Sequence, residues 1–340
     1  MAVELTVLND LIVNGNGNMI SAERAPVVLF VFNRPEHTRR TLRALAANTI
    51  AADSALHIFC DGSRTGSTDE ELNRVREVRN LVRSRLWCGT VTVHDRSVNF
   101  GLAGSIRDGV DQILAAHHRV IVLEDDMETS PGFLQYMNDA LDAYAERDDV
   151  MHVTGYLPAT SYQWALPETF LASYMSCWGW GTWSRSWTQA RWNAADLLVE
   201  LDKSPGGRRR FDLDGSAGFS AQLAANSRGE LNTWAIYWGV SIYLAGGLCL
   251  FPGHSLVRNI GTDGSGENFR TDQRDRYDVP IAEGIEVRLV PAGESLRGRA
   301  YLRAFHRHGA HSGLIRRARI ALGRGKHRIA ERLRIVGDRD

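Results

Sequence analysis

Three consecutive carboxylates, Glu124, Asp125 and Asp126, are the residues whose types and spacing point most directly to chemistry. They follow Val120–Leu123, an apolar run that predicts a buried strand of a mostly parallel sheet. They would then lie at the carboxyl end of that strand, where open α/β sheets bind ligands. Adjacent carboxylates repel one another, so the triplet predicts a hard cation, Mg2+ or Mn2+, shared with substrate phosphates. The alternative is a solvated acidic turn before the helix that Ser130-Pro131 begins.

Two other polar residues follow predicted strands of the same sheet. Residues 26–32 form an apolar run that predicts the first strand, and Arg34 stands between it and an amphipathic helix over 36–48. A second apolar run, 56–60, is followed by Asp61. This order is typical of a doubly wound sheet, so both residues are expected at the ligand edge. The alternatives are a surface arginine near a helix start and an aspartate that only forms a turn.

A glycine-rich segment, Asn99–Gly109, begins the helix that precedes the acidic strand. Its small residues would let a ligand approach a helix N-terminus, where free N–H groups favour anions. One such helix start is a weak signal, and its value comes from its place in the chain. The other elements expected around these motifs are strands over 90–94 and 150–155 and helices over 69–85 and 133–146.

Residues 176–192 hold five of the nine tryptophans of the chain. Some of these are expected in the core, but the glycines between them predict a loop whose aromatic faces suit sugar rings. The polar, glycine-containing stretch 196–228 predicts a mobile loop. The uncharged stretch 234–251 just reaches the length of a membrane span, but Gly246-Gly247 interrupts it. A buried helix, a glycine stop and a short strand are therefore expected there.

Composition narrows the class of protein. The 340 residues can bury a sizeable core, and 40 basic residues balance 40 acidic ones, so no net charge argues for nucleic acid as a partner. The four cysteines are far apart and have no metal-ligand spacing. A reduced, cytoplasmic protein without structural zinc is the natural interpretation.

Changes in composition suggest where the domain begins and ends. The N-terminal residues carry no basic leader pattern and include the run Asn14–Asn18, which predicts a flexible link. The expected units are a flexible segment 1–24, a domain 25–275 and an extension 276–340.

The end of the chain is basic. From Arg297 onward there are 13 lysines and arginines against 3 acidic residues, with apolar residues at helical spacing. Such a tail can lie on an anionic membrane surface, which would place the protein peripherally at the inner face of the cell membrane. Alternatively, it is a solvated helical tail that packs weakly on the domain.

The motifs in this order resemble the GT-A glycosyltransferases. The resemblance covers about residues 26–268 and implies a Rossmann-like, mostly parallel sheet with helices on both faces. It also implies that the domain consists of a nucleotide-binding half 25–128 and an acceptor half 129–275. Asn99–Gly109 is similar to the family 2 inverting transferases, and Val120–Met137 is similar to N-acetylglucosaminyltransferase I. The tryptophan block and the segment Leu256–Gly261 look like those of bacterial transferases of cell-surface polysaccharide assembly.

The resemblance implies a role for each matching residue of the nucleotide half. Asp61 would contact the nucleotide base or ribose, with Asn33 and Arg34 beside it. Asn99 and Gly101 would contact the donor from the glycine-rich segment.

Further roles concern the cation and the sugar. Asp126 would ligate Mn2+ or Mg2+ on the donor diphosphate, while Glu124 and Asp125 would contact ribose or hold the waters of the metal. Arg107 and the metal would neutralise the nucleoside diphosphate leaving group. Trp180 and its neighbours would wall the sugar and acceptor sites.

The general base that an inverting transferase needs has no clear counterpart. Such families carry it after the tryptophan block, where Glu230 is the nearest carboxylate. Asp263 and Glu267 in the segment that closes the domain are the other candidates. His254 is a candidate second metal ligand.

These expectations favour a nucleotide-sugar glycosyltransferase that adds a sugar to a hydroxyl of a glycan or lipid-linked glycan of the cell surface, with inversion. A sugar-phosphate nucleotidyltransferase would share the sheet and the metal, but it should carry a glycine-rich, lysine-containing loop after the first strand, and Phe32–Pro35 has none. A non-catalytic glycan-binding protein on the same fold is the third hypothesis, which the absence of a clear base favours.

Overall fold

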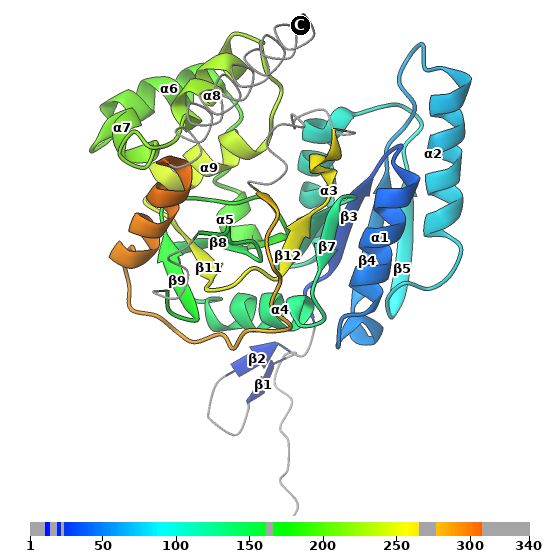
Figure 1. The fold of residues 1–340 in the computed structure, drawn as a ribbon, viewed down its shortest axis with the longest axis horizontal. Helices are drawn as coiled ribbons and strands as arrows, with labels where there is room; N and C mark the ends of the chain where they lie inside the picture. The colour runs from blue at the N-terminus through cyan, green and yellow to red at the C-terminus, as the bar shows by residue number, and fades with distance from the viewer. Residues whose placement is uncertain (1–10, 14–18, 22–23, 161–165, 265–276, 308–340) are drawn as a thin grey trace, which may run out of the picture.

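The protein is built around one eight-stranded sheet (Figure 1). The computed structural model describes residues 11–13, 19–21, 24–160, 166–264 and 277–307. From edge to edge the strands are β5 Thr90–Asp95, β4 Ala55–Cys60, β3 Val27–Val31, β6 Arg119–Glu124, β10 Trp180–Trp183, β8 Val150–Thr154, β11 Leu248–Pro252 and β9 Thr169–Ala172. Within this sheet β9 and β10 run against their neighbours, so the other six strands are parallel. The predicted α/β fold class, with a mostly parallel central sheet, is confirmed.

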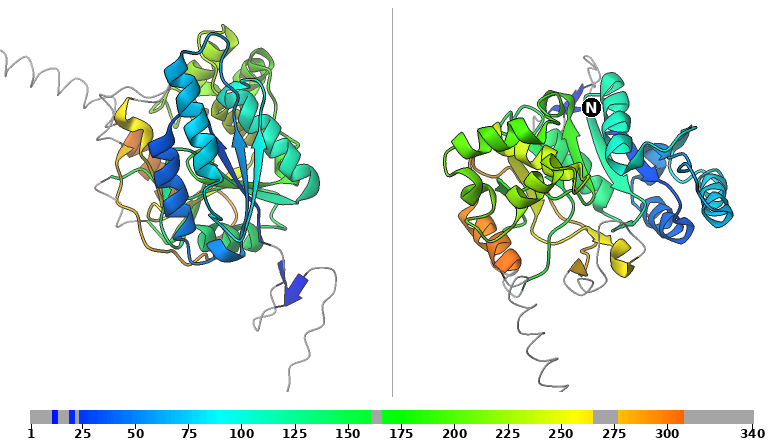
Figure 2. Two further views of the ribbon diagram at one scale, coloured as in Figure 1. Left: turned by 90° about the vertical axis from the view of Figure 1, so that its right-hand side faces the viewer. Right: turned by 90° about the horizontal axis from the view of Figure 1, so that it is seen from above.

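Helices cover both faces of this sheet, as predicted. One face carries α1 Pro35–Ala46, α2 Asp69–Val82 and α4 Phe133–Ala143, and the other carries α3 Gly101–Ala116, α5 Ser184–Trp187 and α9 Ala235–Leu244. Figure 2 shows α1 and α2 on one side of the strands and α3 on the other. Along β3, Val27 and Leu29 pack into the first core, and Val28 and Phe30 pack into the second. A strand buried on both faces needs a continuous apolar run, which is why this segment does not alternate.

The strand order reverses beside β3. From β3 the chain moves outward through β4 to β5, and α3 then returns it to β6 on the other side of β3. The carboxyl ends of β3 and β6 therefore flank a topological switch point, the place where open α/β sheets leave a crevice for ligands.

The prediction of a mobile loop over 196–228 is wrong. The segment forms α6 Ala194–Lys203, α7 Gly207–Phe211 and α8 Phe219–Ser227. Buried apolar residues, among them Leu197, Leu201, Phe211 and Leu223, pack these helices against α9 in a third core. The apolar positions are spaced among many polar and glycine residues, so the composition suggested a loop although the helices bury one face.

The tryptophan block is also more regular than the predicted loop. It contains β10 and α5, and Trp180 at the start of β10 is fully buried. Its ring contacts those of His152, Trp187 and Trp234. The prediction that Trp180 walls the sugar site is therefore wrong, because its side chain lies inside the sheet–helix core.

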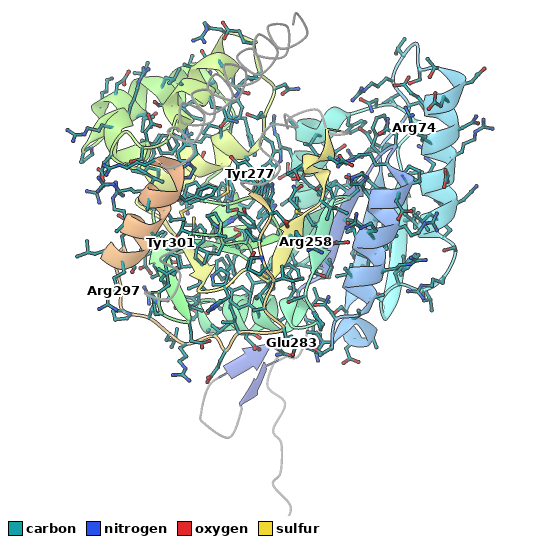
Figure 3. The ribbon with its side chains drawn as sticks, in the orientation of Figure 1. Arg74, Arg258, Tyr277, Glu283, Arg297 and Tyr301 are labelled. Carbon is teal, nitrogen blue, oxygen red and sulfur yellow. The ribbon has the colours of Figure 1, made fainter. Side chains whose placement is uncertain are left out.

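The segment 277–307, predicted as part of a basic extension, packs on the domain. Backbone hydrogen bonds join Gly132 N to Glu283 O and Ser295 N to Leu171 O. The segment ends in a helix over 296–307, where Tyr301 is buried and donates to Pro158 O at 2.7 Å. Figure 3 labels Glu283 and Tyr301 along its course. The rest of the predicted tail lies outside the described residues.

Smaller elements complete the fold. β7 Met127–Thr129 pairs with β12 Val257–Asn259, and the short helix η3 Gly261–Asp263 follows. Within the segment 1–24, β1 Leu11–Val13 pairs with β2 Met19–Ser21, and η1 Ala51–Asp53 follows α1. The helix, glycine turn and strand predicted for 234–251 are confirmed by α9 and β11. None of the described helices combines the length and the apolar character that crossing a membrane requires.

A buried histidine joins β8 to the second core. His152 is fully buried, and its Nε2 lies 2.9 Å from Ser176 O. Its Nδ1 accepts a hydrogen bond from Trp238 Nε1 at 3.2 Å. Because a carbonyl only accepts and the indole only donates, the ring is held as the neutral Nε2–H tautomer. Burial lowers the pKa of His152 from 6.5 to about 4.

The lowered pKa of His152 should make the protein less stable in mild acid. Below its unfolded pKa the unfolded chain binds a proton that the folded chain excludes, so stability falls as the pH drops from 6.5 toward 4. We expect His152 to cost about 2 kcal/mol of unfolding free energy between pH 7 and pH 5. Urea titrations of the wild type and His152→Gln at both pH values measure it. A glutamine offers a donor and an acceptor for the same two partners but binds no proton in this range. The unfolding free energy of His152→Gln should therefore fall by about 2 kcal/mol less than that of the wild type between pH 7 and pH 5. The control His118→Gln, at an exposed position, should lose as much as the wild type. Equal losses in all three proteins would contradict the assignment.

Candidate functional site

A cavity of about 670 Å3 opens at the carboxyl ends of the strands. Its lining contains the predicted site residues Asn33, Arg34, Asp61, Asn99, Gly101, Glu124, Asp125 and Asp126. Arg74 on α2 and Tyr277 in the C-terminal segment also line it, and Figure 3 labels both. Eight residues predicted from three separate strand ends and one helix start thus come together around one cavity.

Arg34 forms ion pairs with the acidic cluster, by which we mean Glu124, Asp125 and Asp126. Its Nε donates to Asp125 Oδ2 at 3.2 Å, and its Nη2 bonds both to Asp125 Oδ1 and, at 3.0 Å, to Asp126 Oδ2. Arg34 stands at the N-cap of α1, three residues after β3, and the cluster begins with Glu124, the last residue of β6. Because β3 and β6 are adjacent parallel strands, their carboxyl ends bring the guanidinium and the carboxylates together.

Burial and like charges shift the pKa values of this group. Burial, then Asp126 and Asp125, raise the pKa of Glu124 to about 8. Glu124 is half-buried by surface area because it faces the cavity, yet protein atoms enclose it closely enough for burial to be the main cause. Burial also raises the pKa of Asp126, against the opposing charge of Arg34. Burial alone would lower the pKa of Arg34, but the charges of Asp125 and Asp126 outweigh it and raise that pKa.

One atom of the cluster fits a cation ligand. Asp126 is 8% exposed, and its Oδ1 is a buried oxygen that has no hydrogen-bond partner within the part of the chain that the structure describes. Among those same residues, no three His, Cys, Asp or Glu side chains are placed to hold a metal ion together. The unpartnered oxygen suits a hard cation of the kind that takes one or two protein carboxylates and completes its shell with water and substrate phosphates.

Asp61 is fully occupied by internal hydrogen bonds. It is 6% exposed, and its two carboxylate oxygens accept from Gly62 N, Phe100 N, Gly101 N and Asn99 Nδ2 at 2.8–3.1 Å. Each oxygen offers two lone pairs, so these four donors use the acceptor capacity of the carboxylate. The residue thereby fixes the loop at the start of α3, where Gly101 has a φ of +66° that glycine adopts readily.

Other predicted residues lie away from this cavity lining. Arg107 is exposed and its guanidinium stacks 4.4 Å from the centroid of the Trp192 ring. His254 is exposed in the turn between β11 and β12. Glu230 is exposed and pairs with Arg228 at 2.7 Å. None of these three side chains lines the cavity.

The remaining two base candidates belong to the closing segment. Asp263 Oδ2 lies 3.2 Å from His37 Nε2, and the charge of His37 in turn acts on Asp126. Two residues before Asp263, Gly261 lines the cavity. Glu267 lies outside the described residues. His37 was not predicted, because a single histidine in the first turn of a helix gives no sequence signal.

Another part of the cavity is walled by aromatic rings, most of which the sequence did not indicate. We call Tyr156, Tyr174, Trp178, Phe211, Phe219, Tyr277, Phe305 and His306 the aromatic cluster. Successive rings lie in contact, with centroids 4.5–6.0 Å apart. They come from five separate parts of the chain, so no single local motif could have indicated the whole cluster. Of the tryptophan block, Trp178 belongs to this wall, and the buried Trp180 does not.

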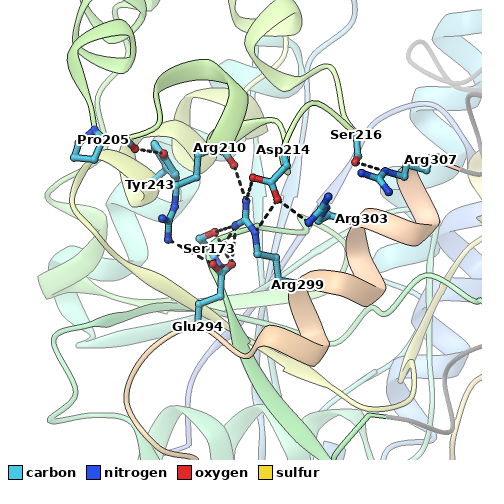
Figure 4. A network of polar contacts seen from close by, with 10 residues as sticks. All are labelled: Ser173, Pro205, Arg210, Asp214, Ser216, Tyr243, Glu294, Arg299, Arg303 and Arg307. Atoms are coloured by element: carbon cyan, nitrogen blue, oxygen red, sulfur yellow. Dashed lines mark hydrogen bonds and ion pairs between the residues drawn. The ribbon is translucent and has the colours of Figure 1, made fainter.

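A polar network supports this wall from outside (Figure 4). Arg299 pairs with Asp214 at 3.1 Å and with Glu294 at 3.0 Å, and Arg303 also pairs with Asp214 at 3.0 Å. The network joins the helix 296–307 to the connection between α7 and α8, where Leu213 and Asp214 have φ values of +51° and +58°. Non-glycine residues rarely adopt this conformation, so the ion pairs hold a strained turn beside Phe211 and Phe219.

Three solved structures are similar to this chain. The chain is similar to a mannosyltransferase from Pyrobaculum calidifontis in complex with GDP-Man and Mn2+, with 13% identity over 66% of this chain and 73% of that one and a TM-score of 0.37. It is similar to S. aureus TarS, with 15% identity over 53% of this chain and 30% of that one and a TM-score of 0.32. For galactosyltransferase LgtC in complex with donor and acceptor sugar analogs, the identity is 9% over 76% and 85% of the two chains and the TM-score is 0.35.

Comparisons at the level of sequence found nothing further. No protein-family model matches the chain, and no curated protein matches it.

Asp61 gives a test of how the site is held together. Asp61→Asn replaces one accepting oxygen by an NH2 group and leaves buried N–H donors without partners, so we expect a loss of about 1–3 kcal/mol of unfolding free energy. Urea denaturation without any nucleotide measures it, and Asp53→Asn, which removes an exposed carboxylate, is the matched control. If Asp61 served only to contact a nucleotide, its substitution would leave the stability of the free protein unchanged.

Proposed function

We propose that the protein is a glycosyltransferase that uses Mn2+ or Mg2+ and moves a sugar from a nucleotide-sugar donor to a hydroxyl of a cell-surface glycan. The observation that carries the proposal is the meeting of Arg34, Asp61 and the acidic cluster at the switch point of a parallel sheet, beside a cavity of about 670 Å3. Fixed charges of both signs at that place suit a ligand that brings phosphates and a cation together.

The nucleotide half of the cavity provides the donor site in this proposal. Asp126 would hold the cation through its unpartnered Oδ1, and Glu124 and Asp125 would contact ribose or the waters of the metal. When bound, the cation supplies positive charge that stabilises the diphosphate as it leaves. Asp61 would act by fixing the loop of Asn99 and Gly101, whose backbone begins α3 beside the same cavity. Asn33 would contact the donor from the end of β3.

The acceptor half provides the sugar and acceptor sites. Aromatic faces bury the apolar C–H surface of a sugar ring, and the aromatic cluster presents several of them on one wall. The network of Arg299 and Asp214 would keep that wall in place. We propose a glycan or lipid-linked glycan as the acceptor, reached from the cytoplasmic side, with the basic C-terminal tail as a peripheral contact with the membrane.

Transfer with inversion needs a carboxylate that accepts the proton of the acceptor hydroxyl. Of the predicted candidates, Asp263 is favoured because η3 places it two residues from Gly261 in the cavity lining and His37 holds its carboxylate. Glu267 remains a candidate from the same segment. Glu230 is disfavoured, because its carboxylate is paired on the surface.

Donor binding is the direct test of the function. UDP-, GDP-, dTDP- and CMP-sugars are screened by thermal unfolding, each with and without Mn2+. One nucleotide should raise the melting temperature only when Mn2+ is present, and a ligand at a hundred times its Kd stabilises by about 2.7 kcal/mol. Asp126→Asn should lose this shift. Glu128→Gln, two positions along, should keep it, because that carboxylate pairs with Arg40 and Arg258 outside the cavity.

The outcomes separate the hypotheses. A shift that Asp126→Asn leaves intact would refute the role of Asp126, and no shift with any nucleotide would favour a non-catalytic protein. Binding without turnover of any acceptor would indicate an inactive transferase.

The general base is tested in single-turnover transfer assays with the donor found by that screen. Asp263→Asn should keep donor affinity and lower the transfer rate about 100-fold or more, since a positioned base contributes 10²–10⁴-fold. Glu230→Gln should transfer at the wild-type rate, and Glu267→Gln is measured beside it. Normal transfer by Asp263→Asn would exclude this residue.

A further inference from the structure

We propose that Arg34 is the built-in counter-ion of the acidic cluster and competes with the divalent cation for it, so that cation and donor bind together and neither binds tightly alone. This inference rests on the proposed function, because it concerns the cation and donor of the same site. It assigns Arg34 a positioning and regulatory role beyond a contact with the donor.

The geometry of the guanidinium carries the first step. Arg34 uses two nitrogens on Asp125, and its Nη2 also bonds Asp126 Oδ2 at 3.0 Å. One positive charge thus serves two carboxylates in a half-buried place, with Glu124 as a third carboxylate beside them. A planar guanidinium can bridge two carboxylates in this way, whereas a single ammonium is a point charge.

The second step concerns the two oxygens of Asp126. Oδ2 is held by Arg34, while Oδ1 is buried without a partner. A cation on Oδ1 would share this carboxylate with the guanidinium, and like charges so close together repel strongly where little water screens them. Arg34 and the cation therefore weaken each other's binding to the acidic cluster as long as the cluster is the only negative charge near them.

The surroundings of Asp126 limit how this conflict can be relieved. Ile260 N donates to Asp126 O at 2.9 Å, and a Cβ at Gly261 would lie 2.1 Å from Asp126 Oδ2 and 3.0 Å from Arg34 Nη1. The backbone of the closing segment thus packs directly on the Arg34–Asp126 ion pair, so the carboxylate cannot simply move aside. The long side chain of Arg34 is the part that can move.

The backbone of Arg34 is fixed by α1, whereas the hydrogen bonds of its guanidinium go to the acidic cluster itself. Arg34 O accepts from Thr38 N at 3.0 Å and from Thr38 Oγ1 at 2.8 Å, as the first turn of α1 forms. The guanidinium can therefore turn from the cluster toward the cavity that it lines. A diphosphate there would offer negative charge to both the guanidinium and the cation. Donor and cation should then raise each other's affinity by the same factor, as linkage requires.

The test measures Mn2+ binding to the protein without donor, by electron paramagnetic resonance of free Mn2+. Arg34→Gln should bind Mn2+ at least tenfold more tightly than the wild type, because the competing charge is gone. Arg34→Lys, which keeps the charge but cannot bridge two carboxylates, should lie between them. The control is Arg40→Gln, which removes an arginine of the same helix whose partner, Glu128, lies outside the cavity, and its Mn2+ affinity should match the wild type.

Equal or weaker Mn2+ binding by Arg34→Gln would overturn the proposal, as would the absence of Mn2+ binding in both proteins. If Arg34→Gln does not fold, Arg34→Lys decides in the same way. The proposed function is judged separately by nucleotide binding. Tighter Mn2+ binding in the variants without any nucleotide binding would uphold the competition and refute the transferase. Nucleotide binding together with an unchanged Mn2+ affinity in the Arg34 variants would refute the competition and support the transferase.

Discussion

The ion pairs between Arg34 and the acidic cluster are the interaction on which the rest of the site depends. Three carboxylates that end one buried strand repel one another, and their burial raises the pKa of Glu124 and Asp126. Arg34 supplies compensating charge from the neighbouring strand. Burying these charges does little to stabilise the fold, because the cost of removing them from water offsets the gain from pairing. At the ligand edge of the sheet, however, they provide the fixed charges that a binding site for charged ligands needs.

Two neighbouring elements hold this group in place, and a third orders the loop elsewhere in the cavity lining. The pairing of β7 with β12 brings Gly261 onto Asp126, and Thr41 Oγ1 of α1 donates to Asp125 O at 2.8 Å. On the other side, Asp61 gathers the loop before α3 through four hydrogen bonds. The aromatic cluster depends in turn on the helix 296–307, whose ion pairs hold the connection between α7 and α8. The site thus combines a charged part with an aromatic part assembled from distant segments.

Most of the sheet and the charged half of the site could be predicted from the sequence. Buried parallel strands give continuous apolar runs, and parallel neighbours align their carboxyl ends, so Arg34, Asp61 and Asp126 were expected together. The aromatic cluster could not be predicted in this way. Leu197 and Leu223 lie in a stretch whose composition suggests a loop. That Trp178 lines the cavity and Trp180 does not depends on how β10 sits in the sheet, and Phe305 meets Tyr277 only through tertiary packing. The four hydrogen bonds that Asp61 accepts could not be predicted either, because they depend on the geometry of the loop before α3.

The most direct test of this account is a crystal structure of the protein with Mn2+ and a nucleoside diphosphate, with the metal located by its anomalous scattering. The account predicts one Mn2+ bound to a carboxylate oxygen of Asp126 and to the diphosphate, with the guanidinium of Arg34 turned from Asp126 toward the phosphates. A nucleotide bound elsewhere, or a diphosphate in this cavity with Mn2+ away from Asp126 and Arg34 still on both aspartates, would contradict it.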